Sequence, residues 1–373
     1  MIDTDRLYSI FMELCAVDSE PLGERLMADR MTVQLQALGF TVTEDDTGGK
    51  IGGNAGNLYA RLAGTAPGEP LLFSCHLDRV VPGVGVKPRI EGDAIVSDGS
   101  TVLGADDAAG LAALLEAVTA LQESGSLYPA IEVVLTVAEE LALVGSSHFD
   151  LSPVVSRIGF VLDAGGPVGG IVVRAPQQYK FTAQFHGRSA HAGIAPEQGI
   201  SAIQMAALAI SRMELLRIDE ETTANIGSIS AVGPTNIVPE RCELRGEVRS
   251  LDPAKVQFQL ARLTEVIETA ANESGGTVTV TTTPCYPALR LNETCEPAQR
   301  AARAAERIGV PVRFSGSGGG SDANYFNERG VPTVVLCCGY EKVHTTAERM
   351  PLDQLALLAG WVTEIIAGGV AEA

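Results

Sequence analysis

The sequence has no long uninterrupted apolar segment, although 46% of its 373 residues are hydrophobic. A helix that spans a membrane needs about 20 consecutive, mostly apolar residues, so the sequence excludes a membrane-spanning protein. The first residues, MIDTDRLYSIF, are acidic at positions where a secretory signal peptide carries positive charge. Export is therefore not expected.

Positive charge is also scarce, because 27 lysines and arginines face 46 aspartates and glutamates, which gives a formal net charge of −19. A chain this acidic is repelled by nucleic acid and by anionic membrane surfaces, so neither is an expected partner. The seven cysteines form no C-x-x-C pair. Cys337 and Cys338 lie in an apolar run that is typical of a buried strand. These features predict reduced thiols and a cytoplasmic protein.

The chain lacks internal repeats and low-complexity tracts, and its length predicts two domains. Over residues 1–174 and again over 285–373, apolar strands alternate with helices. This alternation is typical of an α/β domain with a mostly parallel sheet flanked by helices. Residues 175–284 instead follow the order β-α-β-β-α-β of a ferredoxin-like α+β unit. The second domain is therefore expected to be inserted into the first.

Apolar periodicity predicts the positions of the main elements. A helix is expected over residues 107–122, and it leads into a β-rich run at 130–138. A further strand is expected over 157–162. In the inserted segment, the same spacing predicts helices over 196–213 and 253–273.

Side chains that bind metals follow the ends of several predicted strands. In LLFSCHLD, His76 and Asp78 are two residues apart in an extended segment and therefore point to the same side. Ligands of open α/β sheets bind outside the carboxyl ends of the strands, and oxygen and nitrogen donors there suit zinc, manganese or cobalt. A pair of divalent cations would also relieve the repulsion among the acids. The other candidates at such positions are Asp106, Asp107, Glu139, Glu140, Asp163 and His344.

Each candidate taken alone also has an ordinary structural explanation. His76 and Asp78 could share a buried hydrogen bond, and either Asp106 or Asp107 could cap the helix that follows. The adjacent glutamates of VAEE could be solvated loop acids, and His344 could be an ordinary loop histidine that binds no metal. Because neighbouring side chains of an extended segment diverge, one glutamate can instead hold a metal while the other takes a proton from water. The convergence of all these groups on strand ends favours the metal site.

Seven motifs occur in the order CHLDRVVPG, VLGADDAAG, VAEE, VLDAGG, GRSAHAG, NIVPE and VHTTAE. In this combination the chain resembles, over nearly its whole length, the co-catalytic dinuclear zinc hydrolases that include peptidase T, aminoacylases and glutamate carboxypeptidases. The stretch from HLDRVVPG to ADDAAG is most similar to the peptidase T (tripeptidase) branch. Relatives near that branch often have lysine where this chain has Ala108, so any role of that lysine is absent here.

The resemblance implies two Zn²⁺ ions per chain, with Co²⁺ or Mn²⁺ as substitutes. The matching ligands are His76, Asp106 and Asp163 for one ion and Asp106, Glu140 and His344 for the other. Asp106 would bridge the two ions, and Asp78 would orient His76. The resemblance also implies that Glu139 is the general acid and base and that the peptide between Asp106 and Asp107 is cis.

Further matches concern the substrate. The family histidine that matches His191, in GRSAHAG, reaches the active site of the partner subunit and stabilises the oxyanion. Asn236 matches a residue that contacts substrate across a dimer, and Arg249 matches an arginine that binds the substrate carboxylate. Without the resemblance, His191 would be interpreted as stabilising a turn and Arg249 as forming a surface salt bridge. In SGSGGGS, small residues allow a backbone to approach a ligand, so Gly320 and Ser321 are expected to line the pocket for the substrate's terminal groups.

These expectations describe a cytoplasmic metallopeptidase, a homodimer assembled through the inserted lid domain, that cleaves short peptides as a tripeptide aminopeptidase. An N-acyl amino acid amidohydrolase or a carboxypeptidase of the same family remains an alternative, because these branches share the ligand set and every candidate substrate has a carboxylate. The alternative from another class is a non-catalytic metal-binding or assembly protein. Such a protein would be expected to have lost ligands or the base, whereas here every motif position is filled.

Overall fold

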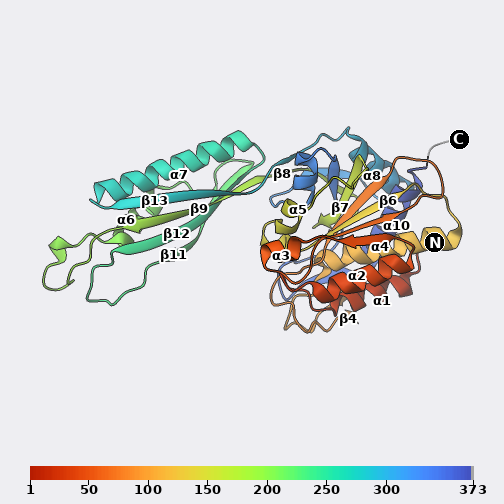
Figure 1. The fold of residues 1–373 in the computed structure, drawn as a ribbon, viewed down its shortest axis with the longest axis horizontal. Helices are drawn as coiled ribbons and strands as arrows, with labels where there is room; N and C mark the ends of the chain where they lie inside the picture. Colours follow the sequence, from red (N-terminus) through yellow and green to blue (C-terminus); the bar gives the residue numbers. More distant parts are fainter. Residues whose placement is uncertain (371–373) are drawn as a thin grey trace. The chain divides into compact units, whose positions relative to one another are not determined.

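The computed structural model describes residues 1–370, which divide into two compact units (Figure 1). Unit 1 comprises Met1–Ala175 together with the chain from Leu289 onward, and unit 2 comprises Pro176–Ala288. Unit 2 is thus inserted between two segments of unit 1, and its ends lie close to the expected positions 175 and 284. Among residues 1–370, none of the helices has both the length and the apolar character that a membrane span requires.

Unit 1 is built on a nine-stranded sheet with a parallel centre. Its strands are β1 (Thr41–Glu44), β2 (Leu58–Leu62), β3 (Leu71–His76), β6 (Ile131–Thr136), β7 (Ile158–Ala164), β8 (Gly170–Ala175), β14 (Leu289–Arg290), β15 (Arg313–Gly316) and β16 (Thr333–Cys337). The order is β1-β2-β6-β3-β7-β16-β8-β14, and β15 pairs with β8. β3 pairs in parallel with β6 and β7, and β7 pairs in parallel with β16. The carboxyl ends of these four central strands therefore lie at one edge of the sheet.

Both faces of this sheet are covered by packed side chains. Leu71 and Phe73 on β3 belong to the larger core, whereas Leu72 between them belongs to a second core. The helices that contribute to the larger core include α1 (Thr4–Cys15), α2 (Arg25–Ala37), α4 (Ala105–Ser124), α8 (Glu296–Arg307) and α10 (Leu352–Ala367). The second core includes Phe326 of α9 (Ala323–Glu328). α1 and α4 lie side by side in unit 1 (Figure 1), and the buried strands confirm the expected α/β sheet flanked by helices.

Helix α4 begins at the edge where the central strands end. Gly104 precedes it with a φ of +76°, and Gly125 ends it with a φ of +66°, a left-handed conformation that glycine adopts without a steric penalty. Asp106 and Asp107 have non-helical backbone angles, so regular helix starts only after them. This start agrees with the predicted range 107–122. Nearly every residue of α4 from Ala108 to Leu121 is buried, which makes α4 the central helix of the larger core.

Unit 2 is a five-stranded antiparallel sheet in the order β10-β11-β12-β9-β13, with two helices packed against it. Its elements are β9 (Gln177–His186), α6 (Ala202–Arg212), β10 (Leu216–Arg217), β11 (Thr222–Ser230), β12 (Arg241–Ser250), α7 (Pro253–Glu273) and β13 (Thr277–Tyr286). Apart from the short β10, this is the predicted order β-α-β-β-α-β. The predicted helix over 196–213 is wrong at its start, because residues 196–198 form an isolated 3₁₀ turn and Gly199 is extended.

Several short elements were not expected from the sequence. They are α3 (Thr47–Ile51), β4 (Arg89–Glu91), β5 (Ala94–Val96), a 3₁₀ turn at Glu139–Leu141 and β17 (Arg349–Pro351). A further short helix is α5 (Val144–His148). β17, β5 and β4 form a small antiparallel sheet. These elements are too short to display a periodic apolar pattern. β17 matters for the site because it begins directly after the loop that carries His344.

Candidate metal centre

The predicted metal ligands come from neighbouring elements of unit 1. His76 is the last residue of β3, Asp163 is near the end of β7, and Asp106 starts α4. Glu140 lies in the short 3₁₀ turn that follows β6, and His344 lies in the loop after β16. Because β6, β3, β7 and β16 are adjacent and parallel, their ends bring these side chains together.

Two groups of potential ligands share one carboxylate. In the first group, Nε2 of His76 is 3.0 Å from Oδ1 of Asp106 and 3.6 Å from Oδ1 of Asp163. In the second, Nε2 of His344 is 3.4 Å from Oδ2 of Asp106 and 3.2 Å from Oε1 of Glu140. In each group the ligand atoms lie within 4.8 Å of one another. Asp106 thus directs one oxygen to each histidine, which is the arrangement that a bridging carboxylate requires.

Glu140 and His344, in the second group, are placed as ligands of a common ion would be and not as hydrogen-bond partners of each other. Oε1 of Glu140 is buried and has no hydrogen-bond partner among residues 1–370, although Nε2 of His344 is 3.2 Å away. A buried oxygen without a partner is costly unless something else satisfies it. A divalent cation bound between these two atoms would do so, and imidazole and carboxylate donors suit zinc.

The charges of the cluster are not balanced by basic side chains. In the described part of the chain, the only ion pairs of Asp106, Asp163 and Glu140 are with histidines. Burial, together with the charge of Asp106, raises the pKa of Asp163 to about 8. The nearby carboxylates of Asp106 and Glu140 raise the pKa of His344 to about 10. Such crowding of carboxylates is what bound divalent cations would offset.

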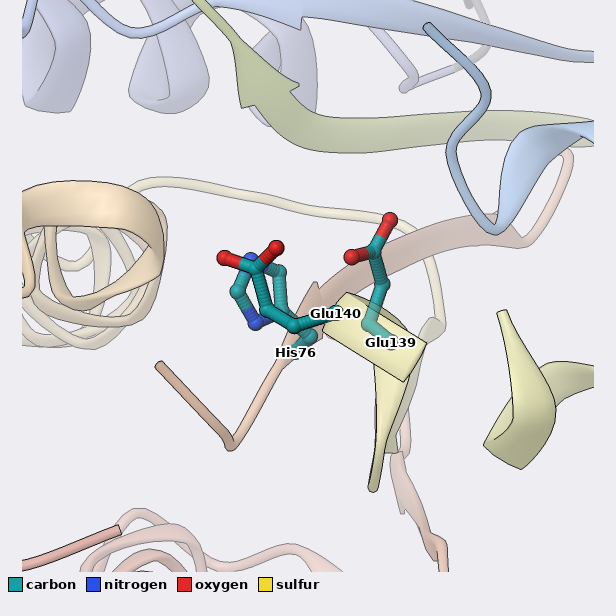
Figure 2. Close-up of side chains that lie close together, drawn as sticks. All are labelled: His76, Glu139 and Glu140. Carbon is teal, nitrogen blue, oxygen red and sulfur yellow. The ribbon is translucent and has the colours of Figure 1, made fainter. Parts of the chain in front are cut away.

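Glu139 lies beside the cluster but has a different position from Glu140. Figure 2 shows the Glu140 carboxylate over the imidazole of His76 and the Glu139 carboxylate pointing in another direction. One ligand atom from each of His76, Glu139 and Glu140 lies within 4.8 Å of the others. Burial raises the pKa of Glu139 well above its usual value, and the charge of Asp163 acts in the same sense. The two glutamates of this turn thus point in different directions.

Asp78 contacts His76 differently from what the sequence predicts. Nδ1 of His76 lies 2.8 Å from the backbone carbonyl of Asp78 and 3.5 Å from its carboxylate. Donation from Nδ1 to this carbonyl leaves Nε2 as the lone-pair atom, as a metal ligand requires. The Asp78 carboxylate instead accepts the backbone amides of Glu139 at 3.0 Å and Glu140 at 3.1 Å. Asp78 therefore holds the turn that carries both glutamates.

Asp107 has a structural role at the start of α4. It is buried, and its carboxylate accepts the backbone amides of Gly110 at 3.1 Å and His76 at 3.3 Å. It thus caps the first regular turn of α4 and ties this turn to the end of β3. The peptide between Asp106 and Asp107 is cis, as the resemblance implies. Asp106 remains available for the cluster.

The glycine-rich loop after β15 forms a cavity next to Asp163. The cavity has a volume of about 180 Å³, and Gly320 and Ser321 line it together with Asp163 and small residues of the strands. Ser321 is 4% exposed, and its hydroxyl has no hydrogen-bond partner among the described residues. A cavity with one unpaired hydroxyl and a potential metal ligand can accept a polar group of a small molecule.

The three remaining predicted residues belong to unit 2. His191 and Asn236 lie on adjacent exposed segments, where the backbone amide of Ala192 donates to the carbonyl of Asn236 at 2.9 Å. Nδ1 of His191 accepts the backbone amides of residues 193 and 194, each at 3.1 Å. Arg249 lies on β12, where its guanidinium pairs with Glu247 at 2.8 Å. The structure thus brings His191 and Asn236 together within unit 2, whereas Arg249 occupies a separate strand.

Known proteins resemble both units of the chain. Residues 177–275 match the peptidase dimerisation domain (M20_dimer), and residues 57–207 match peptidase family M28. The uncharacterized protein YqjE of Bacillus subtilis is 43% identical over 98% of this chain and 99% of its own. The structure of aminopeptidase PepT from Bacillus cereus is 45% identical, with a TM-score of 0.91 and 98% of both chains covered. A tripeptidase from Staphylococcus aureus is 40% identical, with a TM-score of 0.95 and the same coverage.

The chain belongs to the peptidase T-like group of M20 peptidases. This membership confirms the resemblance read from the seven motifs, and it makes the protein a peptidase, a hydrolase of peptide bonds. It also confirms the fold class, since the similar structures cover both the α/β unit and the inserted antiparallel unit.

Two residues of this peptidase reach the cluster without having been assigned a role from the sequence. The hydroxyl of Tyr340 lies 3.4 Å from Oδ1 of Asp106. Glu348 is 2% exposed and accepts the backbone amide of Asp106 at 3.2 Å. Glu348 is the last residue of the VHTTAE motif, so the signal was present. Its partners lie 242 to 245 positions away in the chain, and no local pattern identifies them.

Proposed function

We propose that this peptidase is a tripeptide aminopeptidase that uses two zinc ions, bound by the cluster around Asp106. The observation that carries the proposal is the position of Asp106 between two histidines, with Oδ1 at 3.0 Å from His76 and Oδ2 at 3.4 Å from His344. Two ligand groups with one shared carboxylate suit two neighbouring cations. The names of the similar B. cereus aminopeptidase and S. aureus tripeptidase support the choice of substrate.

The ions would be held by the two groups of side chains already described. His76 and Asp163 would bind one, Glu140 and His344 would bind the other, and Asp106 would bridge them. Bound there, the cations would polarise the scissile carbonyl and lower the pKa of a water molecule.

Glu139 is the proton carrier in this proposal. Glu139 is 8% exposed, and its carboxylate lies close to the ligand atoms of His76 and Glu140, so it would be near the attacking water without being needed as a ligand. As the oxygen of the water forms its bond to the carbonyl carbon, Glu139 accepts the proton. It then donates this proton to the departing amine when the peptide bond breaks. Asp78 contributes by holding the backbone of Glu139 through a hydrogen bond of 3.0 Å.

We assign the oxyanion contact to His191. Its Nδ1 accepts two backbone amides, so in the neutral ring the proton resides on Nε2 and can be donated to a developing negative charge. Because the segments of His191 and Asn236 are in contact, Asn236 would reach the substrate together with His191. In a homodimer assembled through unit 2, these two residues would complete the site of the other subunit. Residues 177–275, which match a dimerisation domain, support this assembly.

The ends of the substrate are assigned to two further places. The Arg249 guanidinium would bind the peptide's carboxylate, for which its planar pair of donors is suited. This requires Arg249 to loosen its present ion pair with Glu247. The cavity lined by Gly320 and Ser321 would accept another terminal portion of the peptide, and its volume of about 180 Å³ limits that portion to a small group.

A panel of substrates tests this function on protein reconstituted with zinc. A tripeptide with a free α-amine, the same tripeptide with an acetylated amine, and an N-acyl amino acid are assayed in parallel, and bound metal is counted by mass spectrometry. We expect cleavage of the free tripeptide, loss of cleavage on acetylation, and two zinc ions per chain. Preference for the N-acyl amino acid would identify an amidohydrolase instead. Two bound ions without cleavage of any substrate would favour a non-catalytic metal-binding protein.

A further inference from the structure

Glu348 connects the two loops that carry ligands of the second proposed ion. It follows His344 by four residues in the loop between Glu341 and Arg349. Its carboxylate reaches across to the start of α4, where Oε2 accepts the backbone amides of Leu103 at 2.9 Å and Gly104 at 2.7 Å. Oε1 accepts the backbone amide of Asp106 at 3.2 Å. One side chain thus joins the His344 loop to the backbone of Asp106.

Other contacts also hold each of the two loops. The residues on either side of the His344 loop, Glu341 and Arg349, pair through two backbone hydrogen bonds of 2.9 and 3.1 Å. On the other side of Gly104 lies Arg79, which is 2% exposed and donates to the carbonyls at the end of α1. A Cβ at Gly104 would lie 2.9 Å from the Arg79 guanidinium. Gly104 is therefore packed against Arg79 while its amide is held by Glu348.

All three partners of Glu348 are N–H donors, so both of its oxygens must act as acceptors. A carboxylate does this with charge-assisted hydrogen bonds, and its negative charge at the start of α4 is favourable. An amide side chain cannot replace it, because a glutamine would place an NH₂ group against one of these donors. The requirement is therefore for the carboxylate itself and not only for a side chain of this size.

From this geometry we infer that Glu348 is a positioning residue that sets the separation of Asp106 and His344 and thereby the affinity for the second metal ion. The inference rests on the proposed dinuclear centre and goes beyond it, because Glu348 is not among the proposed metal ligands or substrate-binding residues. Groups that orient metal ligands change metal affinity by about 10- to 100-fold when they are removed. The ion shared by Asp106, Glu140 and His344 should be affected most, since Glu348 holds two of its three ligands.

Glu132 provides a matched control in the same unit. It is also a fully buried glutamate, and its carboxylate accepts the backbone amides of Val155 and Ser156 at 3.2 and 2.8 Å. It lies at the start of β6, the end of the strand away from the cluster. Glu132 also accepts the hydroxyls of Tyr59 and Ser156. Glu132→Gln therefore makes the same substitution at another buried anchor of backbone amides, away from the ligand loops.

The experiment measures zinc binding to the full chain by competition with a chromophoric chelator after the metal has been removed. Glu348→Gln should bind one of its two zinc ions about 10-fold or more less tightly than the parent, whereas Glu132→Gln should bind both like the parent. Glu348→Asp keeps the negative charge on a shorter side chain, and its zinc affinity should lie between those of Glu348→Gln and the parent. This variant serves as the test if Glu348→Gln does not fold.

Parental affinity for both ions in the two Glu348 variants would overturn the inference while leaving the dinuclear centre intact. Equal loss of zinc in Glu132→Gln would also overturn it, because the effect would then come from general destabilisation. Fewer than two zinc ions bound by the parent protein would instead overturn the dinuclear centre and, with it, this inference.

Discussion

The carboxylate of Asp78 accepts the backbone amide of Glu139 at 3.0 Å. This hydrogen bond connects the strand that ends in His76 to the turn that carries the proposed proton carrier. The other carboxylate oxygen of Asp78 accepts the backbone amide of Glu140 at 3.1 Å. A single buried aspartate thus determines where both glutamates lie. Asp78 is thereby a positioning residue for the turn as well as for the imidazole.

Replacing Asp78 with asparagine should disturb this turn. The amide NH₂ group of asparagine would face one of the two backbone donors, because asparagine has only one acceptor oxygen. We expect Asp78→Asn to lower kcat by about 10- to 100-fold while KM for a tripeptide changes little. Steady-state kinetics with the metal content measured on the same samples would check this. Parental kcat would show that the turn does not depend on Asp78.

Glu139→Gln should abolish turnover with both metals still bound. The change removes the group that accepts and returns the proton, and general acid–base catalysis contributes about 10²- to 10⁴-fold. Because Glu139 is not a proposed ligand, zinc stoichiometry by mass spectrometry should equal that of the parent. Turnover within a few-fold of the parent would remove Glu139 from the mechanism. Loss of zinc from the variant would assign Glu139 to the metal ligands instead.

Removal of the metals should lower both activity and stability. The cluster gathers Asp106, Asp163 and Glu140 without a lysine or arginine partner in the described chain, so bound cations would stabilise the folded state. An ion at 100 times its dissociation constant contributes about 2.7 kcal/mol. We therefore expect a chelator to lower the melting temperature and zinc, cobalt or manganese to restore it.

His344→Ala is the control for this experiment. It removes one ligand of the second group and should reduce the gain in melting temperature on adding zinc. A melting temperature that is the same with and without zinc in the parent protein would contradict the stabilising role.

A side chain added to the glycine-rich loop should block the small cavity beside Asp163. Gly319 lines this cavity, and the only atom near a Cβ built on it is the Ser317 hydroxyl at 3.9 Å, so valine can be accommodated without backbone strain. We expect Gly319→Val to lower kcat/KM for a tripeptide by about 10-fold or more, chiefly through KM, because it fills space that the substrate needs.

Gly318→Val is the matched control on the same loop. Gly318 does not line the cavity, and a Cβ there has open space around it. Its kcat/KM should stay close to that of the parent. If the two valine variants have the same kinetics, the cavity is not a substrate site.

Mixed dimers can reveal whether His191 acts in its own subunit or in the other. Glu139→Gln and His191→Ala should each inactivate a homodimer. When the two variants are co-expressed with different tags and the mixed dimer is purified, the subunit that keeps Glu139 can receive His191 from its neighbour. We expect partial recovery of activity, up to about half of the parental value per dimer. A mixed dimer as inactive as the two variants would place His191 and Glu139 in the same chain.

Local sequence signals were sufficient for some elements and not for others. The predicted helix over 253–273 agrees with α7, because Asp252 caps it by accepting the amide of Ala254 and Pro253 occupies its first turn. The predicted helix over 196–213 starts too early. There the cap is Ser201, which accepts the amide of Gln204, and the apolar spacing before it does not reveal where the regular turns begin.

Some features of the candidate site could likewise be predicted from local sequence, and others could not. The chemical types needed for metal binding could be recognised in the sequence because the ends of apolar strands are visible as ends of apolar runs. The role of Asp78 toward the glutamates could not be predicted, because its partners are 61 and 62 residues away. Glu348 was missed for the same reason, since the amides that it accepts lie on another loop.

The sequence by itself determined the α/β class, the inserted antiparallel unit, the peptidase family and the side chains able to hold metals. The class and the inserted unit follow from apolar periodicity, and the metal-binding side chains follow from residue types at the ends of apolar runs, which are local properties of the chain. The family follows from the resemblance carried by the seven motifs. Only the tertiary structure decided that Asp106 directs one oxygen to His76 and the other to His344. It also decided that buried carboxylates such as Asp78 and Glu348 hold backbone amides instead of other side chains. The reason is that these contacts depend on parallel strand pairing and loop packing, which join residues far apart in the sequence.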